Sequence, residues 1–281
     1  MGNNFARFLP FSQSAKAGGA EGTREAPAPQ FEVGAALEEV EPDVYLKRDT
    51  AMTPSILLTG KQFLTLQRHL PARVQSRRWR LLFCSGLHGF SRVALQNSCT
   101  KELRRARGKE RPAILIISAG SEGNILLGAY VSCIPQASNK RYVGTEESFL
   151  FCVPPPSSSS SSSSSYSSSS DGELCIFTAP ENAANHYFMR CDNGSIAVGG
   201  GGKGPAIFLH DDLATVSCST FCPTFGLKES LLLLNARSNG YCDAAAAAGC
   251  PSDVRLEGGE PAASVRSIQL WTVGDEYFVA S

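Results

Sequence analysis

A glycine-rich segment, Gly199–Gly204, has the residue types of a phosphate-binding loop. Such a loop cradles phosphate with backbone N–H groups at the start of a helix and follows the pattern G-x-x-x-x-G-K-[ST]. When the pattern is placed on Lys203, Ala197 stands where the first glycine is required, and a glycine replaces the final serine or threonine. An apolar, strand-like stretch follows, not a helix. We therefore predict a turn between two strands, in which Gly200 and Gly201 supply backbone freedom, and no bound cofactor.

Two pairs of adjacent carboxylates, Glu146–Glu147 and Asp211–Asp212, are the candidates for acid–base chemistry. Paired-carboxylate catalysis needs both carboxyl groups to face one substrate. Glu146 and Glu147 are adjacent at the entry of a predicted strand, and a strand sends neighbouring side chains to opposite faces. A meeting of one of them with Asp211 or Asp212 across an end of the sheet stays open. We favour hydrogen bonding to turn N–H groups, and predict no catalytic residue.

Histidine and cysteine spacing gives little support for a metal site. His88 lies in a turn before a predicted helix, and the other histidines are scattered. Structural zinc usually requires two C-x₂₋₄-C pairs. Cys218 and Cys222 form one such pair, whereas Cys242 and Cys250 are too widely spaced. We therefore expect no metal, and we expect His88 to hold the helix entrance by hydrogen bonding.

The chain has 10 cysteines, which leaves redox chemistry open. Most lie singly inside apolar stretches and are predicted to be reduced, buried thiols. A reactive thiol needs an electropositive and accessible setting. Cys99, close to Lys101 and Arg104, is the best candidate for one. A cysteine-based redox enzyme or direct oxidant scavenger is therefore the alternative function.

Charge and hydropathy restrict the partners. Lys+Arg and Asp+Glu are both 26, so net charge gives no indication of a nucleic-acid partner. The stretch Lys101–Arg111 carries six basic and two acidic residues, a local charge of +4. This is typical of a solvated helix end, or of a surface for an acidic partner or anionic lipid.

The start of the sequence, Met1-Gly2-Asn3-Asn4-Phe5-Ala6, resembles an N-myristoylation signal, although Ala6 stands where serine or threonine is preferred. Acylation of Gly2 would give peripheral membrane contact only, since one acyl chain binds a bilayer marginally. No apolar run approaches the roughly 18 residues of a membrane span. Without a secretory signal pattern, we expect a cytoplasmic protein, peripheral on acidic-organelle membranes if acylated.

The elements that position these residues are mostly short strands. Helices are predicted after the N-cap Thr53 and after the N-cap Ser91. Asp192-Asn193-Gly194 predicts a tight hairpin turn. The predicted strands are 81–84, 113–118, 125–131, 147–153, 173–178, 187–191, 195–198, 206–209, 213–217, 267–272 and 277–279. This pattern indicates a mainly β, α+β fold: a two-sheet antiparallel β-sandwich with two or more short helices outside.

Composition divides the chain. Residues 1–50 lack sustained periodicity and predict a disordered tail. We expect the folded domain to span 53–279, with two low-complexity loop inserts. The first, 154–171, is almost entirely serine after three prolines, and the second, 230–265, is rich in alanine and glycine.

Several motif blocks, taken together, resemble one family, the TLDc domain. The blocks are Trp79–Ser85 with His88–Ser91, then Tyr142–Phe151, Ser195–Gly202 with Ile207–Leu213, Cys222–Gly226, and Ile268–Trp271. They occur in the family's order, which is more specific than any single block.

The resemblance implies two packed antiparallel sheets and a non-enzymatic role. Proteins of this family are associated with oxidative-stress resistance, and several bind the vacuolar proton-pumping ATPase. We therefore expect subunits of that pump as partners. Loops at sheet ends are natural contact sites. The predicted partner-binding or structural residues are Gly144, Glu146, Glu147, Gly200, Gly201, Asp211 and Asp212.

Overall fold

A computed structural model describes residues 46–47, 56–107, 109, 111–121, 123–137, 141–153, 174–183, 185–236, 254–257 and 259–277. All these residues belong to one compact unit, Glu41–Ser281. Gly2, the expected tail apart from Leu46–Lys47, and the serine tract 154–171 lie outside the described residues. None of the helices in the described part is long and apolar enough to cross a membrane.

The helices are short, and their starts follow from local capping. Thr59 Oγ1 accepts a hydrogen bond from the Gln62 N–H, and the Gln62 side chain accepts one from the Thr59 N–H, a reciprocal capping box. The sequence placed the start of this helix at Thr53, which lies outside the described residues; residues 56–59 are not helical, and α1 begins at Gly60. Ser91 does cap its helix, as expected. The helices are α1 (Gly60–His69), α2 (Ala72–Gln75), α3 (Ser85–His88), α4 (Arg92–Arg105), the 3₁₀ helix η2 (Pro223–Phe225) and α5 (Leu231–Ala236).

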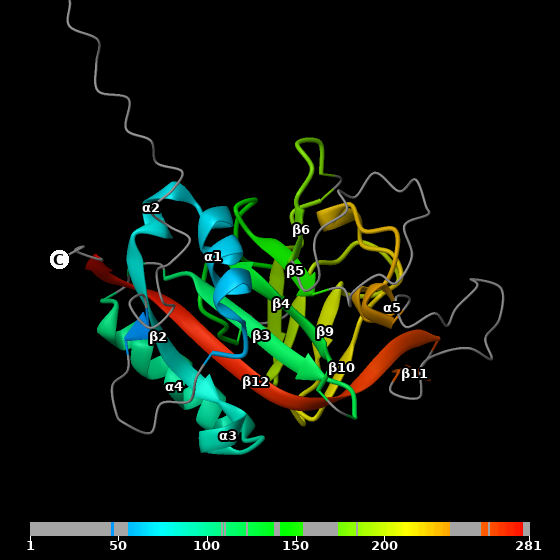
Figure 1. Ribbon diagram of the computed structural model, residues 1–281, viewed down its shortest axis with the longest axis horizontal. Coiled ribbons are helices and arrows are strands. Elements are labelled where there is room, and N and C mark those ends of the chain that lie inside the picture. The colour runs from blue at the N-terminus through cyan, green and yellow to red at the C-terminus, as the bar shows by residue number, and fades with distance from the viewer. Residues whose placement is uncertain are drawn as a thin grey trace, which may run out of the picture. The chain divides into compact units, whose positions relative to one another are not determined.

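The strands form one twelve-stranded sheet, antiparallel except for the β1–β2 pair (Figure 1). Its main path runs β6-β5-β4-β3-β12-β10-β9-β8-β7. The strands are β1 (Leu46–Lys47), β2 (Arg77–Cys84), β3 (Ala113–Ala119), β4 (Ile125–Val131), β5 (Phe149–Val153), β6 (Cys175–Thr178), β7 (Met189–Asp192), β8 (Ser195–Val198), β9 (Ile207–Leu209), β10 (Thr215–Ser217), β11 (Val254–Glu257) and β12 (Glu260–Tyr277).

Strand β12 connects two halves of this sheet and is the long curved red strand in Figure 1. Residues 262–264 pair with β10, whereas Val265–Thr272 pair with β3 and Gln269–Tyr277 pair with β2. The mainly β class and the antiparallel pairing agree with the sequence prediction. The predicted two-sheet sandwich is not confirmed in the described part, because one continuous strand of 18 residues belongs to both halves.

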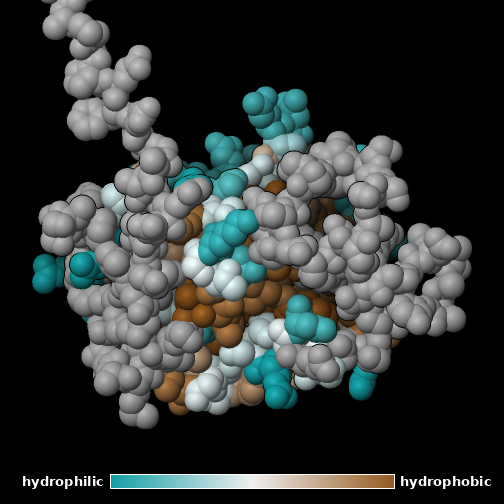
Figure 2. All heavy atoms as spheres, in the orientation of Figure 1, coloured by the Kyte–Doolittle hydropathy of each residue, from teal (hydrophilic) through white to brown (hydrophobic). Residues whose placement is uncertain are grey.

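Both faces of β2–β5 are buried. One face joins side chains of β7–β10 in a common hydrophobic core that includes Leu115, Ile117, Leu127, Met189, Ile196, Leu209 and Val216. The other face carries Trp79, Ile114 and Tyr130, which are fully buried, and the Phe63 ring of α1 packs against Trp79 in a tilted arrangement, with ring centroids 4.7 Å apart. Figure 2 shows apolar side chains beside α1, where this helix covers β3 and β12.

The second expected insert, 230–265, is an ordered part of the fold at both of its ends. Leu231 and Leu232 of α5 are fully buried, because the leucine run faces the core and does not enter solvent. Residues 254–257 and 260–265 form the β11–β12 hairpin. The prediction of a loop was therefore wrong at these ends. Residues 237–253, which contain the alanine run, Cys242 and Cys250, lie outside the described residues.

Candidate functional site

The glycine turn, Gly199–Gly204, joins β8 to β9. Gly201 has a φ of +83°, a backbone conformation that strains residues with a Cβ atom. A Cβ atom on Gly201 would lie 2.2 Å from Asn185 Nδ2, and one on Gly202 would lie 2.1 Å from the carbonyl oxygen of Phe221. Glycine is therefore required here both by backbone conformation and by the close approach of neighbouring segments.

Gly200 is fixed by the buried side chain of Thr224 in η2. The Gly200 N–H donates to Thr224 Oγ1 at 3.1 Å, and that hydroxyl lies 2.6 Å from Asn185 Oδ1 and 3.0 Å from the Gly200 oxygen. The thiol of Cys222 lies 3.6 Å from the same oxygen. The N–H and the oxygen of Gly200 therefore both bond to groups within the protein, and the turn is followed by a strand. This is not the outward array of N–H groups at a helix start that binds phosphate.

Aromatic and basic side chains surround the glycine turn. Tyr142 stacks on Tyr187 with ring centroids 4.5 Å apart, and the Arg190 guanidinium lies 5.4 Å from the Tyr142 ring. Tyr187 is 43% exposed, Phe221 is 49% exposed, and Lys203 is exposed as well. We call Tyr187, Lys203 and Phe221 the glycine-turn surface. Exposed aromatic rings held on a rigid turn are typical of protein interfaces.

Gly144 lies close to the glycine turn. Val143 pairs with Met189 through two backbone hydrogen bonds. Gly144 has a φ of +105°, and a Cβ atom there would lie 3.2 Å from Phe188 Cβ. The Gly199 N–H donates to the Phe188 carbonyl at 2.8 Å. Gly144 and the turn therefore adjoin the same residue, Phe188.

Glu146 and Glu147 lie in a turn before β5, not in a strand as predicted. Glu147 forms an ion pair with Arg73 of α2, in which Nη1 lies 2.7 Å from Oε1 and 2.6 Å from Oε2. Glu146 is exposed. Burial is the main cause that raises the pKa of the nearby Tyr130 hydroxyl. Glu147 therefore ties α2 to the sheet, and the two carboxylates do not form a catalytic pair.

Asp211 and Asp212 form the turn after β9. Asp212 Oδ1 accepts hydrogen bonds from the backbone N–H groups of Ala214 (2.8 Å) and Thr215 (3.1 Å). Asp211 forms a 3.3 Å ion pair with Arg92 of α4, and Arg92 Nη1 also donates to a backbone oxygen of the β7–β8 hairpin. Asp212 thus closes its own turn, and Asp211 helps to attach α4 to the hairpin.

The acidic turn and the glycine turn lie at opposite ends of β9. Val198 pairs with Ile207 next to the glycine turn, whereas Ile196 pairs with Leu209 next to the acidic turn. The predicted site residues therefore do not all lie at one end of the sheet. Gly144, Gly200 and Gly201 are brought together, while Asp211 and Asp212 are not part of that group.

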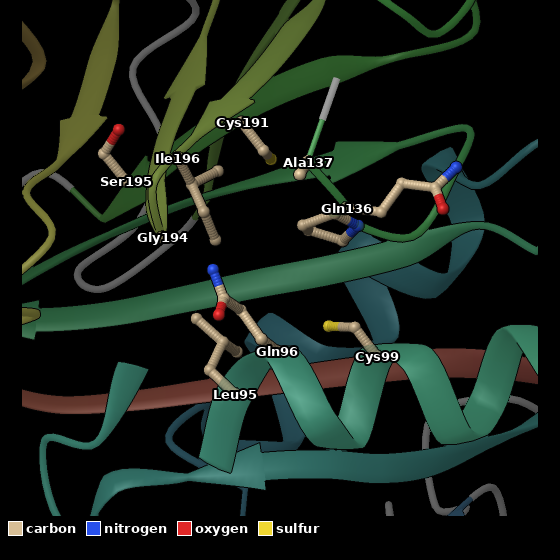
Figure 3. A pocket seen from close by; sticks show the side chains of 10 residues that line it. Leu95, Gln96, Cys99, Gln136, Ala137, Cys191, Gly194, Ser195 and Ile196 are labelled. Carbon is tan, nitrogen blue, oxygen red and sulfur yellow. The ribbon is translucent and has the colours of Figure 1, made fainter. Parts of the chain in front are cut away.

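A small pocket separates α4 from the β7–β8 hairpin (Figure 3). Its volume is about 20 Å³, and Cys99 and Cys191 both contribute to its wall, with Leu95 and Ile196 (Figure 3). Burial raises the pKa of the Cys99 thiol to about 12 and also raises the pKa of Cys191. Both thiols are therefore protonated at neutral pH, and the setting is not that of an activated nucleophile.

His88 is a structural residue. Its Nδ1 lies 3.1 Å from both the backbone nitrogen and the backbone oxygen of Cys84, and its ring stacks on Phe83 with centroids 5.3 Å apart. Within the described ranges, no three histidine, cysteine or acidic side chains are grouped to hold a metal ion. His88 therefore joins α3 to β2, whereas the sequence analysis expected it in a turn at the entrance of the helix capped by Ser91.

Comparison with known proteins places the chain in a family. The model of the TLDc domain matches residues 51–239. The chain belongs to the TLDc domain family. Oxidation resistance protein 1 of Mus musculus is 30% identical over 193 residues, which cover 68% of this chain and 19% of that protein. Nuclear receptor coactivator 7 of Homo sapiens is 32% identical over 170 residues, which cover 59% of this chain and 15% of that protein.

The TLDc match covers the glycine turn and η2, whereas β11 and β12 lie beyond it in the same sheet. The matched region is less than a fifth of these relatives' length. Sequence reasoning missed two residues that shape the site, Asn185 and Arg73. Asn185 stands in no recognisable motif, and Arg73 reaches Glu147 from 74 positions away. Thr224 was quoted in a motif block but given no role.

Proposed function

We propose that this TLDc protein contributes to oxidative-stress resistance by binding a partner, not by catalysis. The proposal draws on the family membership and on the name of one relative, oxidation resistance protein 1. It is supported by the protonated state of the buried Cys99 and Cys191 thiols, which does not favour the alternative of a cysteine-based enzyme or scavenger.

The partner we propose is the vacuolar proton-pumping ATPase, which the resemblance to TLDc proteins suggests. The location we propose is the cytoplasm, at the surface of acidic organelles. We assign the contact to the glycine-turn surface because exposed aromatic residues lie there above a turn that is held rigidly. Tyr187 and Phe221 are exposed, yet the turn beneath them is fixed by Thr224 and by glycines that tolerate no Cβ atom. A rigid surface loses little conformational entropy on binding.

The acidic residues have a different role in this proposal. Glu147 and Asp211 are engaged by arginines, and Asp212 is engaged by its own turn. We therefore propose that these three stabilise the fold, while Glu146 remains as an exposed charge that affects association rate and salt dependence.

The test is capture of the pump from purified acidic-organelle membranes by the full chain, followed by identification of the pump subunits by mass spectrometry. We expect the double variant Tyr187→Ser, Phe221→Ser to lose capture with an unchanged melting temperature. The matched control is Leu256→Ser, which removes an exposed apolar side chain from β11. Capture that survives the double variant would refute the surface. Failure of the wild-type protein to capture any pump subunit at low salt would refute the partner.

The stress-resistance part is tested in cells that lack their own TLDc protein. Expression of the wild-type chain should increase survival after exposure to hydrogen peroxide, and the double variant should not. If the purified chain instead consumes peroxide catalytically, and a single Cys→Ser change abolishes this, the redox alternative replaces the proposal.

A further inference from the structure

Three apolar side chains are exposed where α3 meets α4. Leu87 is 46% exposed, Phe90 is 44% exposed, and Val93 is 59% exposed. We call these three residues the apolar corner. The other large apolar side chains exposed in the described part, Tyr187, Phe221 and Leu256, come from other segments. Exposed apolar residues are ordinary when scattered singly, but a group of them indicates an interaction surface.

The apolar corner continues into an exposed stripe along α4. This stripe consists of five exposed residues, Val93, Asn97, Thr100, Lys101 and Arg104. They follow one another at spacings of four, three, one and three residues. Positions at these spacings lie on one side of a helix. From Val93 to Arg104 the stripe is about 16 Å long, at 1.5 Å per residue. Val93 of the apolar corner and the basic end of α4 therefore face solvent on the same side of the helix.

The basic end of α4 is not neutralised by its own segment. Its exposed cations are Lys101, Arg104, Arg105, Arg107 and Lys109. Between residues 85 and 111 the sequence holds two carboxylates, Glu102 and Glu110, against these five cations and Arg111.

Glu102 is 4% exposed and lies beneath the helix. It is paired with Arg80 of β2, and one of its oxygens lies 3.8 Å from Arg111. Arg92, at the other end of α4, is paired with Asp211. An excess of positive charge therefore remains at the C-terminal end of the helix.

We propose that the apolar corner and the exposed stripe of α4 form a binding surface for an anionic phospholipid bilayer. A bilayer offers apolar acyl chains just below a layer of negative phosphates, and this surface presents apolar side chains at the start of α4 and cations toward its end. Figure 1 shows α3 at the edge of the molecule, where no other labelled element covers it. The side chains of the corner are free to enter the headgroup layer while the cations remain at its surface.

This arrangement favours a membrane over an acidic protein. An acidic protein surface would neutralise the cations but would leave Leu87, Phe90 and Val93 in water. The inference stands apart from the proposed pump contact, which uses the glycine-turn surface. Vesicles contain no pump, so the two proposals fail separately.

The first experiment is co-sedimentation of the full chain with vesicles. The chain is produced without N-terminal acylation, so that Gly2 carries no lipid. We expect binding to phosphatidylcholine vesicles that contain phosphatidylserine, no binding to pure phosphatidylcholine, and a loss of binding as salt is raised. A cation held at an anionic leaflet favours binding about fivefold. The triple variant Lys101→Glu, Arg104→Glu, Arg105→Glu should therefore bind at least about a hundredfold more weakly.

The matched control reverses three exposed charges on other elements, Arg68→Glu, Lys228→Glu and Arg255→Glu. It changes the net charge by the same amount and should retain most of the binding. Equal losses in the two triple variants would overturn the proposal, because binding would then follow total charge and not this surface.

The second experiment removes the apolar corner. The double variant Leu87→Ser, Phe90→Ser should bind about tenfold more weakly or worse, because inserted apolar area is lost. Leu256→Ser is the control and should bind as the wild type does. Since both corner side chains are exposed, far-ultraviolet circular dichroism should show unchanged folding. If the double variant binds normally, the corner does not insert. If no vesicle binds the wild type but poly-glutamate does, the surface is for an acidic protein and the proposal is wrong.

Discussion

Replacing Gly201 by alanine tests whether the glycine turn is as tightly constrained as its contacts indicate. A φ of +83° costs an L-residue about 1–2 kcal/mol. The new Cβ atom would lie 2.2 Å from Asn185 Nδ2 and 3.0 Å from Pro223 Cγ, so the Asn185 side chain must move. Asn185 Oδ1 then loses its hydrogen bonds with the Thr224 hydroxyl and the Tyr187 N–H, each worth about 1 kcal/mol. We expect a loss of about 3–4 kcal/mol in the free energy of unfolding.

The matched control is Gly226→Ala. Gly226 also has a positive φ, +62°, but a Cβ atom there would meet nothing within 4 Å. It should lose the conformational part alone, about 1–2 kcal/mol. Urea unfolding measures both variants, provided that the slope of the free energy against urea concentration is unchanged. If the two variants lose the same free energy within about 0.5 kcal/mol, the contacts with Asn185 contribute nothing and the reasoning is wrong.

Three further predictions concern other parts of the fold. Glu102→Gln removes the buried partner of two guanidinium groups and should cost about 3–5 kcal/mol by urea unfolding, whereas the exposed Glu181→Gln should cost almost nothing. Thr59→Ala removes the cap of α1 and should cost about 1 kcal/mol, with the melting temperature as readout; no change would mean that the capping box adds nothing. Burial raises the Cys99 pKa from 9.0 to about 12, so the unfolded chain releases this proton first. Stability should hold below about pH 9 and fall as pH rises toward 12, and the fall should be shallower in Cys99→Ala.

The strands that the sequence predicted well have strong local signals. The apolar runs at 113–118 and 125–131 became β3 and β4, because both are buried over nearly their whole length. Asn193 and Gly194 have φ values of 50° and 96°, as the predicted Asp-Asn-Gly hairpin requires. Ser91 caps α4 as expected. In each case a few adjacent residues carry the information.

The errors arose where distant contacts decide the structure. Thr53 and Thr59 are both good caps, but only Thr59 is followed by a glutamine three residues on. Glu146 and Glu147 resembled a strand entry, yet Glu147 is held in a turn by Arg73. The leucine run of α5 was read as the start of an insert because its burial partners lie elsewhere in the chain.

The candidate site was predictable in its glycines and not in its organisation. The run of glycines indicated a turn, and Gly200 and Gly201 do form it. Thr224 and Asn185 are 39 positions apart, and no local pattern joins them. The direction of β9, which separates Asp211 and Asp212 from the glycine turn, depends on strand pairing that periodicity does not specify.

The position of β12 has a consequence for how the protein is made. Its Ile268 is hydrogen-bonded to Ser85, which lies 183 positions earlier. At a synthesis rate of about 5–20 residues per second, β2 waits roughly 10–40 s for this partner. During that interval β2 and β3 each expose an edge that can pair with another chain. We therefore expect the nascent protein to depend on chaperones until β12 has left the ribosome, and mutations within β12 to cause aggregation before they cause loss of binding.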